Sequence, residues 1–436
     1  MSQASIRVGI CGLGTVASGV VNTLLDNRDL IARRAGGLID IVHIGARRDN
    51  PNCDTANLKV SRDIFDVAND PEVDILIELI GGTTTARELV ETALKAGKHV
   101  VTANKALIAE AGNELFALAE AQGVTLRFEA AVAGGIPVIK TLREALSANR
   151  IDSVAGIING TGNFILTEMA AKGRSFESVL EEAQALGYAE ADPTFDIDGT
   201  DAAHKLVILA SLAFGMPLDI SAPFTEGIDR VAPEDLENAK ALGYRIKHLG
   251  IARVVGDAVE MRVHPTLIPQ DKQIATVDGV LNAVQIKGDA VGEVLLVGPG
   301  AGAGPTASSV CSDVIDLARV LTNQQSCVVP PWGCLTSQLV ARPVITRAEI
   351  VSSWYLRLTA ENRPGVMSAI TRLLGDEGIS IESMIQKTHK SGSRAPIVLV
   401  TNATSAAALD RACDQIAALD TVGEAITRLR VESFDA

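Results

Sequence analysis

Apolar and polar positions alternate along the first part of the chain with the periods of strands followed by helices. Short apolar runs typical of buried strands lie at 6–11, 39–46, 73–80, 98–103 and 124–130. Amphipathic stretches typical of helices lie between them, at 16–26, 85–96 and 104–122. Strands that alternate with helices in this way predict a doubly wound parallel sheet of the α/β class. We assign this first domain to residues 1–140.

The pattern changes after residue 140. Longer helices are predicted at 163–172, 175–186 and 198–214. Strands are predicted after them, at 245–254, 258–268, 274–277, 281–287 and 292–297. This order predicts an α+β domain with an open sheet over 141–327. Its last helix, at 305–323, is expected to return to the first domain.

The C-terminal part begins after a predicted linker at 328–350. The linker contains Val-Val-Pro-Pro-Trp-Gly and Arg-Pro, which interrupt regular structure. Residues 351–436 then read as a strand, a helix, two strands, a helix and a strand, at 354–360, 366–377, 379–388, 396–402, 405–417 and 422–432. This βαββαβ order predicts a small ferredoxin-like domain.

Composition narrows the class of protein. The net charge of −14 argues against a nucleic-acid partner and against an anionic membrane surface. No apolar run is long enough for a membrane span, and the N-terminus lacks the features of a secretion signal, so we expect a cytoplasmic protein. The six cysteines and six histidines are scattered without metal-ligand spacing, which disfavours a zinc site.

A glycine-rich turn follows the first predicted strand and opens the first helix. Its GxGxxA sequence suits the approach of a pyrophosphate to a helix N-terminus, as in Rossmann dinucleotide-binding domains. A purely structural strand–helix turn is the alternative. The residues expected to contact the nucleotide are Gly12, Leu13, Gly14, Thr15 and Val16.

Cofactor preference depends on the end of the second strand. Arg47 and Arg48 follow that strand, and two guanidinium groups there suit a ribose 2′-phosphate. A solvated pair of loop charges is the other interpretation. Asp49 comes next, and a carboxylate at this position favours the 2′-hydroxyl of NAD(H). The sequence therefore favours NADP(H), with NAD(H) as the alternative.

Two lysines stand in positions suited to catalysis. Lys105 follows the carboxyl end of a predicted parallel strand, where ligands bind in open α/β sheets. Lys205 lies four residues after Asp201, so both share one face of a predicted helix. A surface salt bridge is the simpler explanation of that pair.

Several carboxylates precede this helix. Glu190, Asp192 and Asp196 lie in one predicted loop. Carboxylates beside a lysine suit a substrate that carries an ammonium group, with Lys205 as proton donor. Calcium is the competing interpretation, but the spacing of a calcium-binding loop is missing.

Four long segments resemble the homoserine dehydrogenase family in its longer bacterial form. They are VVTANKALIA, FEAAVAGGIPVIKTLREAL, GIINGTGNFILTEM and AQALGYAEADPTFDIDGTDAAHKLVILA. The resemblance covers essentially the whole chain. It implies the reversible NAD(P)H-dependent reduction of L-aspartate 4-semialdehyde to L-homoserine, a step toward threonine, methionine and isoleucine. It also implies a homodimer or homotetramer.

The resemblance implies roles for individual residues. Lys205 would be the proton donor, and Lys105 would lie between nicotinamide and substrate and share the proton work. The other implied substrate contacts are Glu190, Asp201, Asp196, Gly160 and Thr161. Gly187 and Gly302 would contact the nucleotide. A structural sodium ion would be held by Glu129 and by the carbonyls of Val132, Gly134 and Ile136.

The C-terminal unit resembles an ACT domain. In such domains the turn between the first strand and helix binds an amino acid, often across a dimer interface. That turn is formed here by Asn362, Arg363, Pro364 and Gly365. L-Threonine is the effector that the resemblance implies, and a purely dimerising role is the alternative.

Two other functions compete with this interpretation. Aspartate-semialdehyde dehydrogenase chemistry needs a nucleophilic cysteine, but Cys11 lies within the nucleotide turn and none lies near the carboxylate cluster. A non-catalytic amino-acid sensor would not need the set Lys105, Glu190, Asp201 and Lys205. The intact set favours an enzyme.

Overall fold

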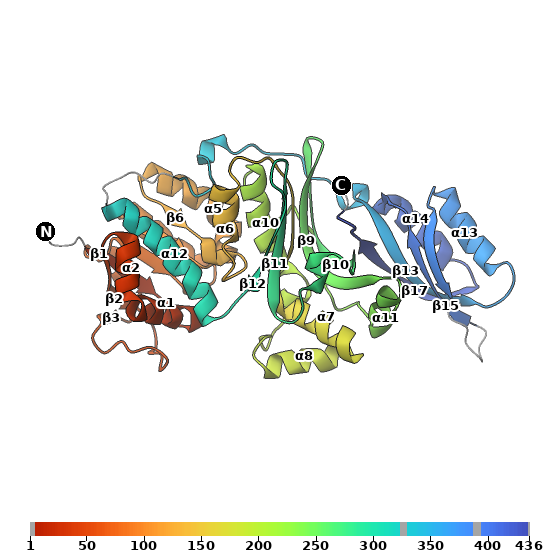
Figure 1. The fold of residues 1–436 in the computed structure, drawn as a ribbon, viewed down its shortest axis with the longest axis horizontal. Coiled ribbons are helices and arrows are strands. Elements are labelled where there is room, and N and C mark those ends of the chain that lie inside the picture. Colours follow the sequence, from red (N-terminus) through yellow and green to blue (C-terminus); the bar gives the residue numbers. More distant parts are fainter. Residues whose placement is uncertain (1–4, 323–328, 387–393, 435–436) are drawn as a thin grey trace.

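A computed structural model of the chain describes residues 5–322, 329–386 and 394–434. Figure 1 shows three parts in sequence order, with the N-terminal domain in red and orange, the central domain in yellow and green, and the C-terminal domain in blue. Parts of three predicted segments lie outside the described residues. They are the last residue of the helix at 305–323, the first residue of the linker at 328–350, and residues 387–388 of the strand at 379–388.

The N-terminal domain is built on a six-stranded sheet with the order β3-β2-β1-β4-β5-β6. All of its strand pairs are parallel. The strands are β1 (Ser5–Cys11), β2 (Leu38–Gly45), β3 (Val60–Ser61), β4 (Ile75–Glu78), β5 (His99–Thr102) and β6 (Leu126–Arg127). The order reverses between β1 and β4, which is the edge where Rossmann folds bind dinucleotides. The predicted fold class is confirmed.

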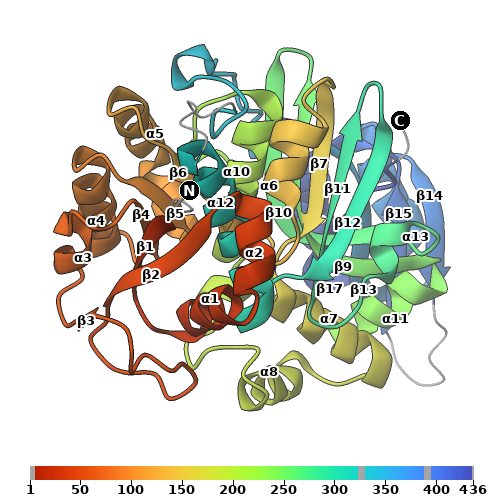
Figure 2. The same ribbon diagram turned by 60° about the vertical axis from the view of Figure 1, so that its left-hand side comes forward.

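Helices cover both faces of this sheet. They are α1 (Thr15–Asp26), α2 (Arg28–Ala35), α3 (Phe65–Asn69), α4 (Thr84–Lys95), α5 (Lys105–Ala121) and α12 (Ala303–Thr322). The last of these comes from far along the chain. Its buried side chains share one apolar core with α1, β1 and β2. The carbonyl of Ala303 approaches Gly19 of α1 so closely that no side chain would fit at that position. Figures 1 and 2 show α12 beside α1 and α2.

One predicted strand of this domain is mostly wrong. The apolar run at 124–130 forms a strand only at β6, and Glu129–Ala131 form the 3-10 turn η1. The chain leaves the sheet there because the buried carboxylate of Glu129 accepts hydrogen bonds from the backbone N–H groups of Ile139 and Lys140. The short elements α2, β3 and α3 were not predicted.

The central domain combines helices with long antiparallel strands. Its helical elements are α6 (Val138–Lys140), η2 (Thr141–Ala145), α7 (Gly160–Lys172), α8 (Phe176–Ala185), α9 (Thr194–Ile197), α10 (Thr200–Phe214), α11 (Pro233–Ala241) and η3 (Gln273–Thr276). Its strands are β7 (Ile151–Ile157), β8 (Phe224–Thr225), β9 (Tyr244–Val255), β10 (Ala258–Pro269), β11 (Leu281–Gly288) and β12 (Gly292–Pro299). Neither β7 nor α11 was predicted.

The predicted strand at 274–277 is wrong, because this segment is the short 3-10 helix η3. Ile274 and Ala275 are buried, which explains the apolar run. Their backbone is satisfied locally, since the N–H of Ala275 donates to the carbonyl of Lys272. An apolar doublet in a tight turn has the same composition as a short strand.

The C-terminal domain joins the sheet of the central domain. Its elements are β13 (Val351–Glu361), α13 (Val366–Asp376), β14 (Ile381–Gln386), β15 (Arg394–Thr401), β16 (Thr404–Ser405), α14 (Ala406–Ala417) and β17 (Val422–Val431). The strand order β17-β13-β15-β14 is that of a ferredoxin-like fold. Strand β17 pairs in parallel with β10, so one eleven-stranded sheet runs through both domains.

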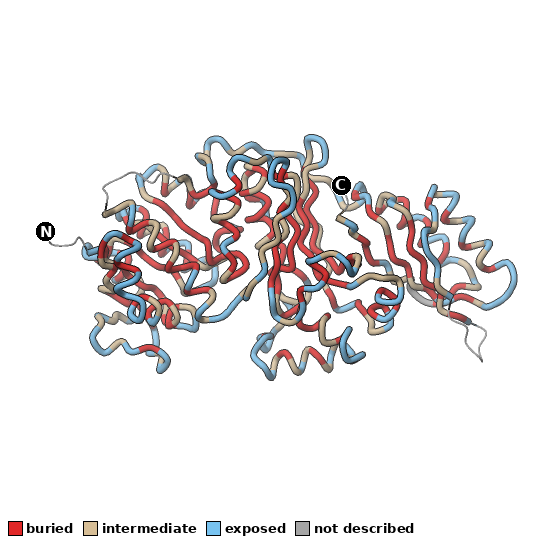
Figure 3. The backbone as a smooth tube through the Cα atoms, in the orientation of Figure 1, coloured by how far each residue is buried: buried red, intermediate tan, exposed pale blue. Residues whose placement is uncertain are grey.

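The segment between these two domains packs against the N-terminal domain. Trp332 is 4% exposed and forms an aromatic cluster with Phe116 of α5 and Phe128. Figure 3 shows the inner strands of both sheets largely buried, whereas the outer turns are exposed, and β12 and β14 contain no buried residue. No helix among the described residues combines the length and apolar character needed to cross a membrane.

Candidate active site

The glycine-rich turn lies between β1 and α1, at the point where the strand order reverses. Gly12 has φ of 100°, and a side chain there would meet the carbonyl of Leu79 at 2.6 Å. Around Gly14 no described atom lies within 4 Å of the position of a Cβ, so the backbone is open to an approaching group. The N-terminus of α1 has no side-chain cap. Its free N–H groups suit a phosphate.

The end of β2 places three charges beside this turn. Arg47 and Arg48 are both exposed, and no hydrogen bond or ion pair ties either of them to another described residue. Asp49 is paired with Arg62, whose Nη2 lies 2.9 Å from Oδ1. The carboxylate of Asp49, which would favour a 2′-hydroxyl, is therefore paired with Arg62, whereas the guanidinium groups of Arg47 and Arg48 are unpaired among the described residues.

A cleft of about 580 Å³ opens between the N-terminal and central domains. It brings together residues that are widely separated in the sequence, including both predicted lysines. The predicted site residues that line it are Lys105, Gly134, Gly160, Thr161, Gly187, Glu190, Asp196, Asp201, Lys205 and Gly302. It is also lined by Asn159 and Asn282, which the sequence analysis did not single out.

Both lysines contact the same carboxylate in this cleft. Nζ of Lys205 lies 2.6 Å from Oδ2 of Asp201, and Nζ of Lys105 lies 3.0 Å from Oδ1. Burial opposes the charge of Asp201, but the two lysines outweigh burial and hold the pKa of this carboxyl well below its usual range. Lys205 also donates to the carbonyl of Ile158 at 2.7 Å. The pair of Asp201 and Lys205 therefore lies inside the cleft and is not a surface salt bridge.

The other carboxylates of the predicted loop differ in exposure. Asp196 is half-buried; burial, reinforced by the charge of Asp201, raises the pKa of its carboxyl. Glu190 is exposed at the rim of the cleft, where its backbone carbonyl accepts from Gln184. Thr161 donates its hydroxyl to the carbonyl of Tyr188, which ties this loop to the start of α7.

A second glycine-rich turn, at 298–304, also lines the cleft. Gly302 has φ of 117°, a conformation that favours glycine. A side chain at Gly300 would collide with Asn282, and one at Gly134 would collide with the carbonyl of Gly300. The turn can therefore approach both domains only because it lacks side chains.

Comparison with known proteins follows the same division into domains. The family model described as "Homoserine dehydrogenase, NAD binding domain" matches residues 12–129, "Homoserine dehydrogenase" matches 137–315 and "ACT domain" matches 354–418. The chain is 53% identical to the homoserine dehydrogenase of Pseudomonas aeruginosa, over 99% of each chain. The chain belongs to the homoserine dehydrogenase family. The predicted resemblance is confirmed, and the protein is an oxidoreductase with an NAD-binding domain and an ACT domain.

Other members of the homoserine dehydrogenase family match all or part of the chain. The Bacillus subtilis protein is 39% identical over 98% of each chain. A solved homoserine dehydrogenase from Thiobacillus denitrificans superposes with a TM-score of 0.93 at 51% identity, covering 99% of each chain. A hyperthermophilic archaeal homoserine dehydrogenase in complex with NADPH has a TM-score of 0.62 at 28% identity, covering 72% of this chain and 97% of its own.

The carbonyls implied as cation ligands lie in one irregular segment after η1. Ala133 and Gly134 there both have positive φ, at 55° and 50°. The carboxyl of Glu129 is buried near Asp313, and burial, followed by the charge of Asp313, raises the pKa of Glu129 to about 8. Among the described residues, no group of three histidine, cysteine or acidic side chains could hold a metal ion.

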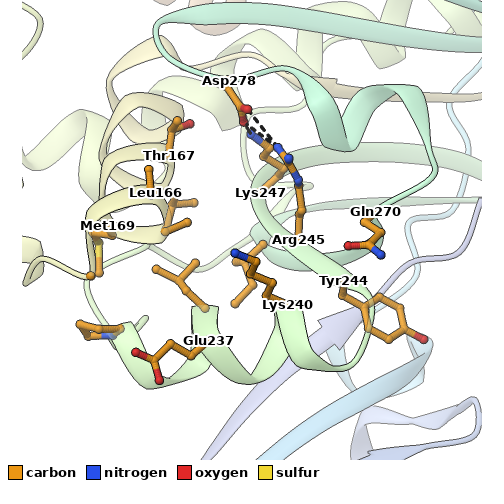
Figure 4. A pocket seen from close by; sticks show the side chains of 16 residues that line it. Leu166, Thr167, Met169, Glu237, Lys240, Tyr244, Arg245, Lys247, Gln270 and Asp278 are labelled. Carbon is orange, nitrogen blue, oxygen red and sulfur yellow. Dashed lines mark hydrogen bonds and ion pairs between the residues drawn. The ribbon is translucent and has the colours of Figure 1, made fainter.

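A second cavity, of about 380 Å³, lies between α7, α11 and β9 (Figure 4). Asp278 lines this cavity and accepts hydrogen bonds from Arg245 and Lys247. Lys247 is buried and also donates to the carbonyl of Val277. This cavity contains none of the residues that the family resemblance implicates.

The predicted regulatory turn stands apart from the cleft. Residues 362–365 are exposed at the end of β13, in the domain farthest from the nucleotide-binding sheet (Figure 1). Gly365 has φ of 93° at the start of α13, and Arg363 pairs with Glu361.

Cysteine chemistry finds no support in the structure. Cys11 is fully buried, and burial raises the pKa of its thiol far above the usual range. The cysteines of the described residues are free thiols, and none lines the cleft. A thioester mechanism of the semialdehyde dehydrogenase type would need an accessible thiolate.

Proposed function

We propose that this protein interconverts L-homoserine and L-aspartate 4-semialdehyde with a nicotinamide dinucleotide. The observation that carries the proposal is the convergence of Lys105 and Lys205 on Asp201 inside the cleft beside the glycine-rich turn. Bound nicotinamide would supply or accept the hydride at the carbon that bears the oxygen. The chain itself must hold the amino acid and move one proton.

We assign the proton to Lys205. Its side chain is 12% exposed, and its Nζ is held by Asp201 and the carbonyl of Ile158. In the direction of reduction the ammonium group of Lys205 gives a proton to the oxygen that gains negative charge. Lys105, which is more exposed, stabilises the same charge from the side of the nucleotide-binding domain. Oxidation returns the proton to Lys205.

The acidic residues suit the amino group of the substrate. Asp196 and Glu190 lie in the cleft on the side of the central domain, and Gly160 and Thr161 open α7 beside them. Carboxylates orient an ammonium group by charge-assisted hydrogen bonds. Asp201 is already paired with two lysines, so we assign to it the positioning of those lysines together with contact to the substrate.

For the cofactor we favour NADP(H) over NAD(H). The available guanidinium groups of Arg47 and Arg48 suit a 2′-phosphate, and Arg62 neutralises Asp49. The turn at Gly12–Val16 would hold the pyrophosphate, while Gly187 and Gly302 face the same cleft.

We also propose a structural sodium ion after η1. Ala133 and Gly134 both have positive φ, so the backbone of this segment is irregular, and hard cations bind backbone carbonyl oxygens. The ligands would be Glu129 and the carbonyls of Val132, Gly134 and Ile136. Its charge would offset the two buried carboxyls of Glu129 and Asp313 and fix the wall of the cleft.

For the ACT domain we propose feedback inhibition by L-threonine, bound at 362–365. One face of its sheet is covered by α13 and α14. The other face shares an apolar core with α7 and α11 of the central domain, through Tyr355, Val398 and Val400. Helix α7 begins in the cleft, so a shift of this core would reach the substrate site. This arrangement favours regulation over dimerisation alone.

The wider context follows from this reaction. We propose that the enzyme serves threonine, methionine and isoleucine synthesis in the cytoplasm as a homodimer or homotetramer. The free thiols of the described cysteines suit a reducing compartment.

Oxidation of NADPH and of NADH with L-aspartate semialdehyde, with and without L-threonine, tests these proposals together. Turnover that prefers NADPH and falls with threonine is the expected result. Absence of turnover with both nucleotides would contradict the reaction, and undiminished turnover with threonine would contradict the regulation.

A further inference from the structure

Asn159 occupies the junction between the substrate carboxylates and the first turn of α7. It is 5% exposed, and all of its polar side-chain atoms are used. Its Oδ1 accepts from the N–H of Gly162 at 2.7 Å and caps the helix. Its Nδ2 donates to Oδ1 of Asp196 at 2.7 Å and to Oδ2 of Asp201 at 2.8 Å.

This amide connects two groups with different tasks. Asp201 holds both lysines, whereas Asp196 is free of any ion pair within the described residues. Without a donor between them, the two carboxylates would repel each other across a partly buried space. A single amide supplies two N–H groups and no charge, so it gives each carboxylate a hydrogen-bond donor.

We propose that Asn159 is a positioning residue. Its amide holds Asp201 in the position where it contacts both lysines, and it orients Asp196 toward the substrate ammonium group. The inference rests on the proposed function and adds a residue to it. Asn159 acts through the two carboxylates rather than on the reacting atoms.

The substitution Asn159→Asp removes both donors. Aspartate has nearly the same shape and is as good a helix cap, so α7 keeps its N-terminal hydrogen bond. It also adds a third carboxylate facing the other two. Asn159→Ser retains a cap and adds no charge, and because a hydroxyl donates at most one hydrogen bond, it removes at least one of the two donors.

The matched control is Asn113→Asp in α5. The amide of Asn113 exchanges two hydrogen bonds with the backbone of Leu218 and lies outside the cleft. The same chemical change is therefore made where only structure is at stake.

We expect kcat/KM for homoserine to fall about 100-fold in Asn159→Asp, as expected for misplaced catalytic groups. Asn159→Ser should lose somewhat less, and the KM for the nucleotide should change less than about twofold in both. Asn113→Asp should keep the kcat/KM and the pH profile of the wild type, whatever its effect on Tm.

The pH profile gives a second readout that a merely structural role would not move. Asp196 faces Asp201, Lys205 and Thr161; burial raises the pKa of its carboxyl, and the Asn159 amide lowers it. Loss of the amide should therefore move the acid limb of kcat/KM for homoserine to higher pH in both variants.

Three results would overturn the inference. Wild-type kcat/KM and an unmoved acid limb in Asn159→Ser would show that the amide is not needed. In either Asn159 variant, a loss of nucleotide affinity as large as the loss of kcat/KM for homoserine, together with a lowered Tm, would show a structural role. Wild-type protein that oxidises no homoserine would remove the proposed function as well, which distinguishes that failure from the first two.

Discussion

Lys105 and Asp201 form an ion pair of 3.0 Å across the cleft between two domains. Lys105 starts α5 of the nucleotide-binding domain, and Asp201 lies in the first turn of α10 in the central domain. The contact sets the separation of the two domains at the point where nicotinamide and substrate must meet. It also leaves Lys205 on the opposite oxygen of the same carboxylate.

Replacement of Lys205 tests the assignment of the proton. We expect Lys205→Ala to lower kcat by about 100-fold to 10,000-fold, the usual contribution of a general acid, with a smaller change in KM. Lys172→Ala is the control, since Lys172 lies at the exposed end of α7 and pairs only with Glu168 among the described residues. Ordinary kcat in Lys205→Ala, with weakened substrate binding, would assign the proton elsewhere.

Cofactor preference can be tested at the end of β2. The double substitution Arg47→Ser with Arg48→Ser should raise the KM for NADPH about tenfold or more and leave the KM for NADH almost unchanged, because only the 2′-phosphate loses its partners. Arg33→Ser, on the exposed side of α2, controls for loss of positive charge. Equal effects on both nucleotides would contradict the assignment.

The sequence predicted the parts of this protein whose signals are local. The GxGxxA turn, the alternating strands and helices, and the i, i+4 pair Asp201–Lys205 depend on short stretches of chain. The two errors at 124–130 and 274–277 are apolar runs that are buried for reasons other than a sheet.

Contacts between distant residues could not be predicted in the same way. Nothing near Asn159 in the sequence indicates that it bridges Asp196 and Asp201, because the bridge forms only when the start of α7 lies beside α9 and the start of α10. The pairing of β10 with β17 likewise joins strands that are separated by more than 150 positions in the sequence. The Asn-Gly-Thr-Gly segment at the start of α7 does indicate a helix cap, since asparagine suits that position.

The interface between the central and ACT domains depends on a buried acid. Asp235 of α11 is fully buried and accepts from Arg357 at 2.5 Å and 3.0 Å and from Tyr355 at 2.9 Å. We expect Arg357→Gln to lower the free energy of unfolding by about 2–3 kcal/mol, because Asp235 loses its counter-charge in a buried place. It should also weaken inhibition by threonine.

The control for this prediction is Arg411→Gln. Arg411 is exposed and pairs with Glu377 in the same domain, away from the turn 362–365, and a surface salt bridge contributes at most about 1 kcal/mol. Urea unfolding of both variants measures the difference. Equal stability of the two variants would contradict a structural role for the Arg357–Asp235 pair.

His264 makes the same interface sensitive to pH. Its ring is fully buried, and Nε2 accepts from Nη1 of Arg262 at 3.2 Å, which requires a neutral ring. Burial, followed by the charges of Arg430 and Arg262, holds the pKa of His264 well below its ordinary value. Below that ordinary value the unfolded chain binds a proton that the folded chain excludes, so stability falls as the pH falls.

We therefore expect the wild type to lose about 1.4 kcal/mol per pH unit at His264 below about pH 6.5. His264→Gln should show a slope shallower by about that amount between pH 6 and 5, whatever its absolute stability. The free energy of unfolding measured across this range decides the matter, and parallel slopes would contradict the prediction.

The most direct test of the central claim is the steady-state rate of NADPH oxidation by the purified protein with L-aspartate 4-semialdehyde, measured for the wild type and Lys205→Ala. The account predicts rapid oxidation by the wild type, with homoserine as the product, and loss of at least about 99% of kcat in the variant. No homoserine from the wild type, or an equal kcat in the two proteins, would contradict it.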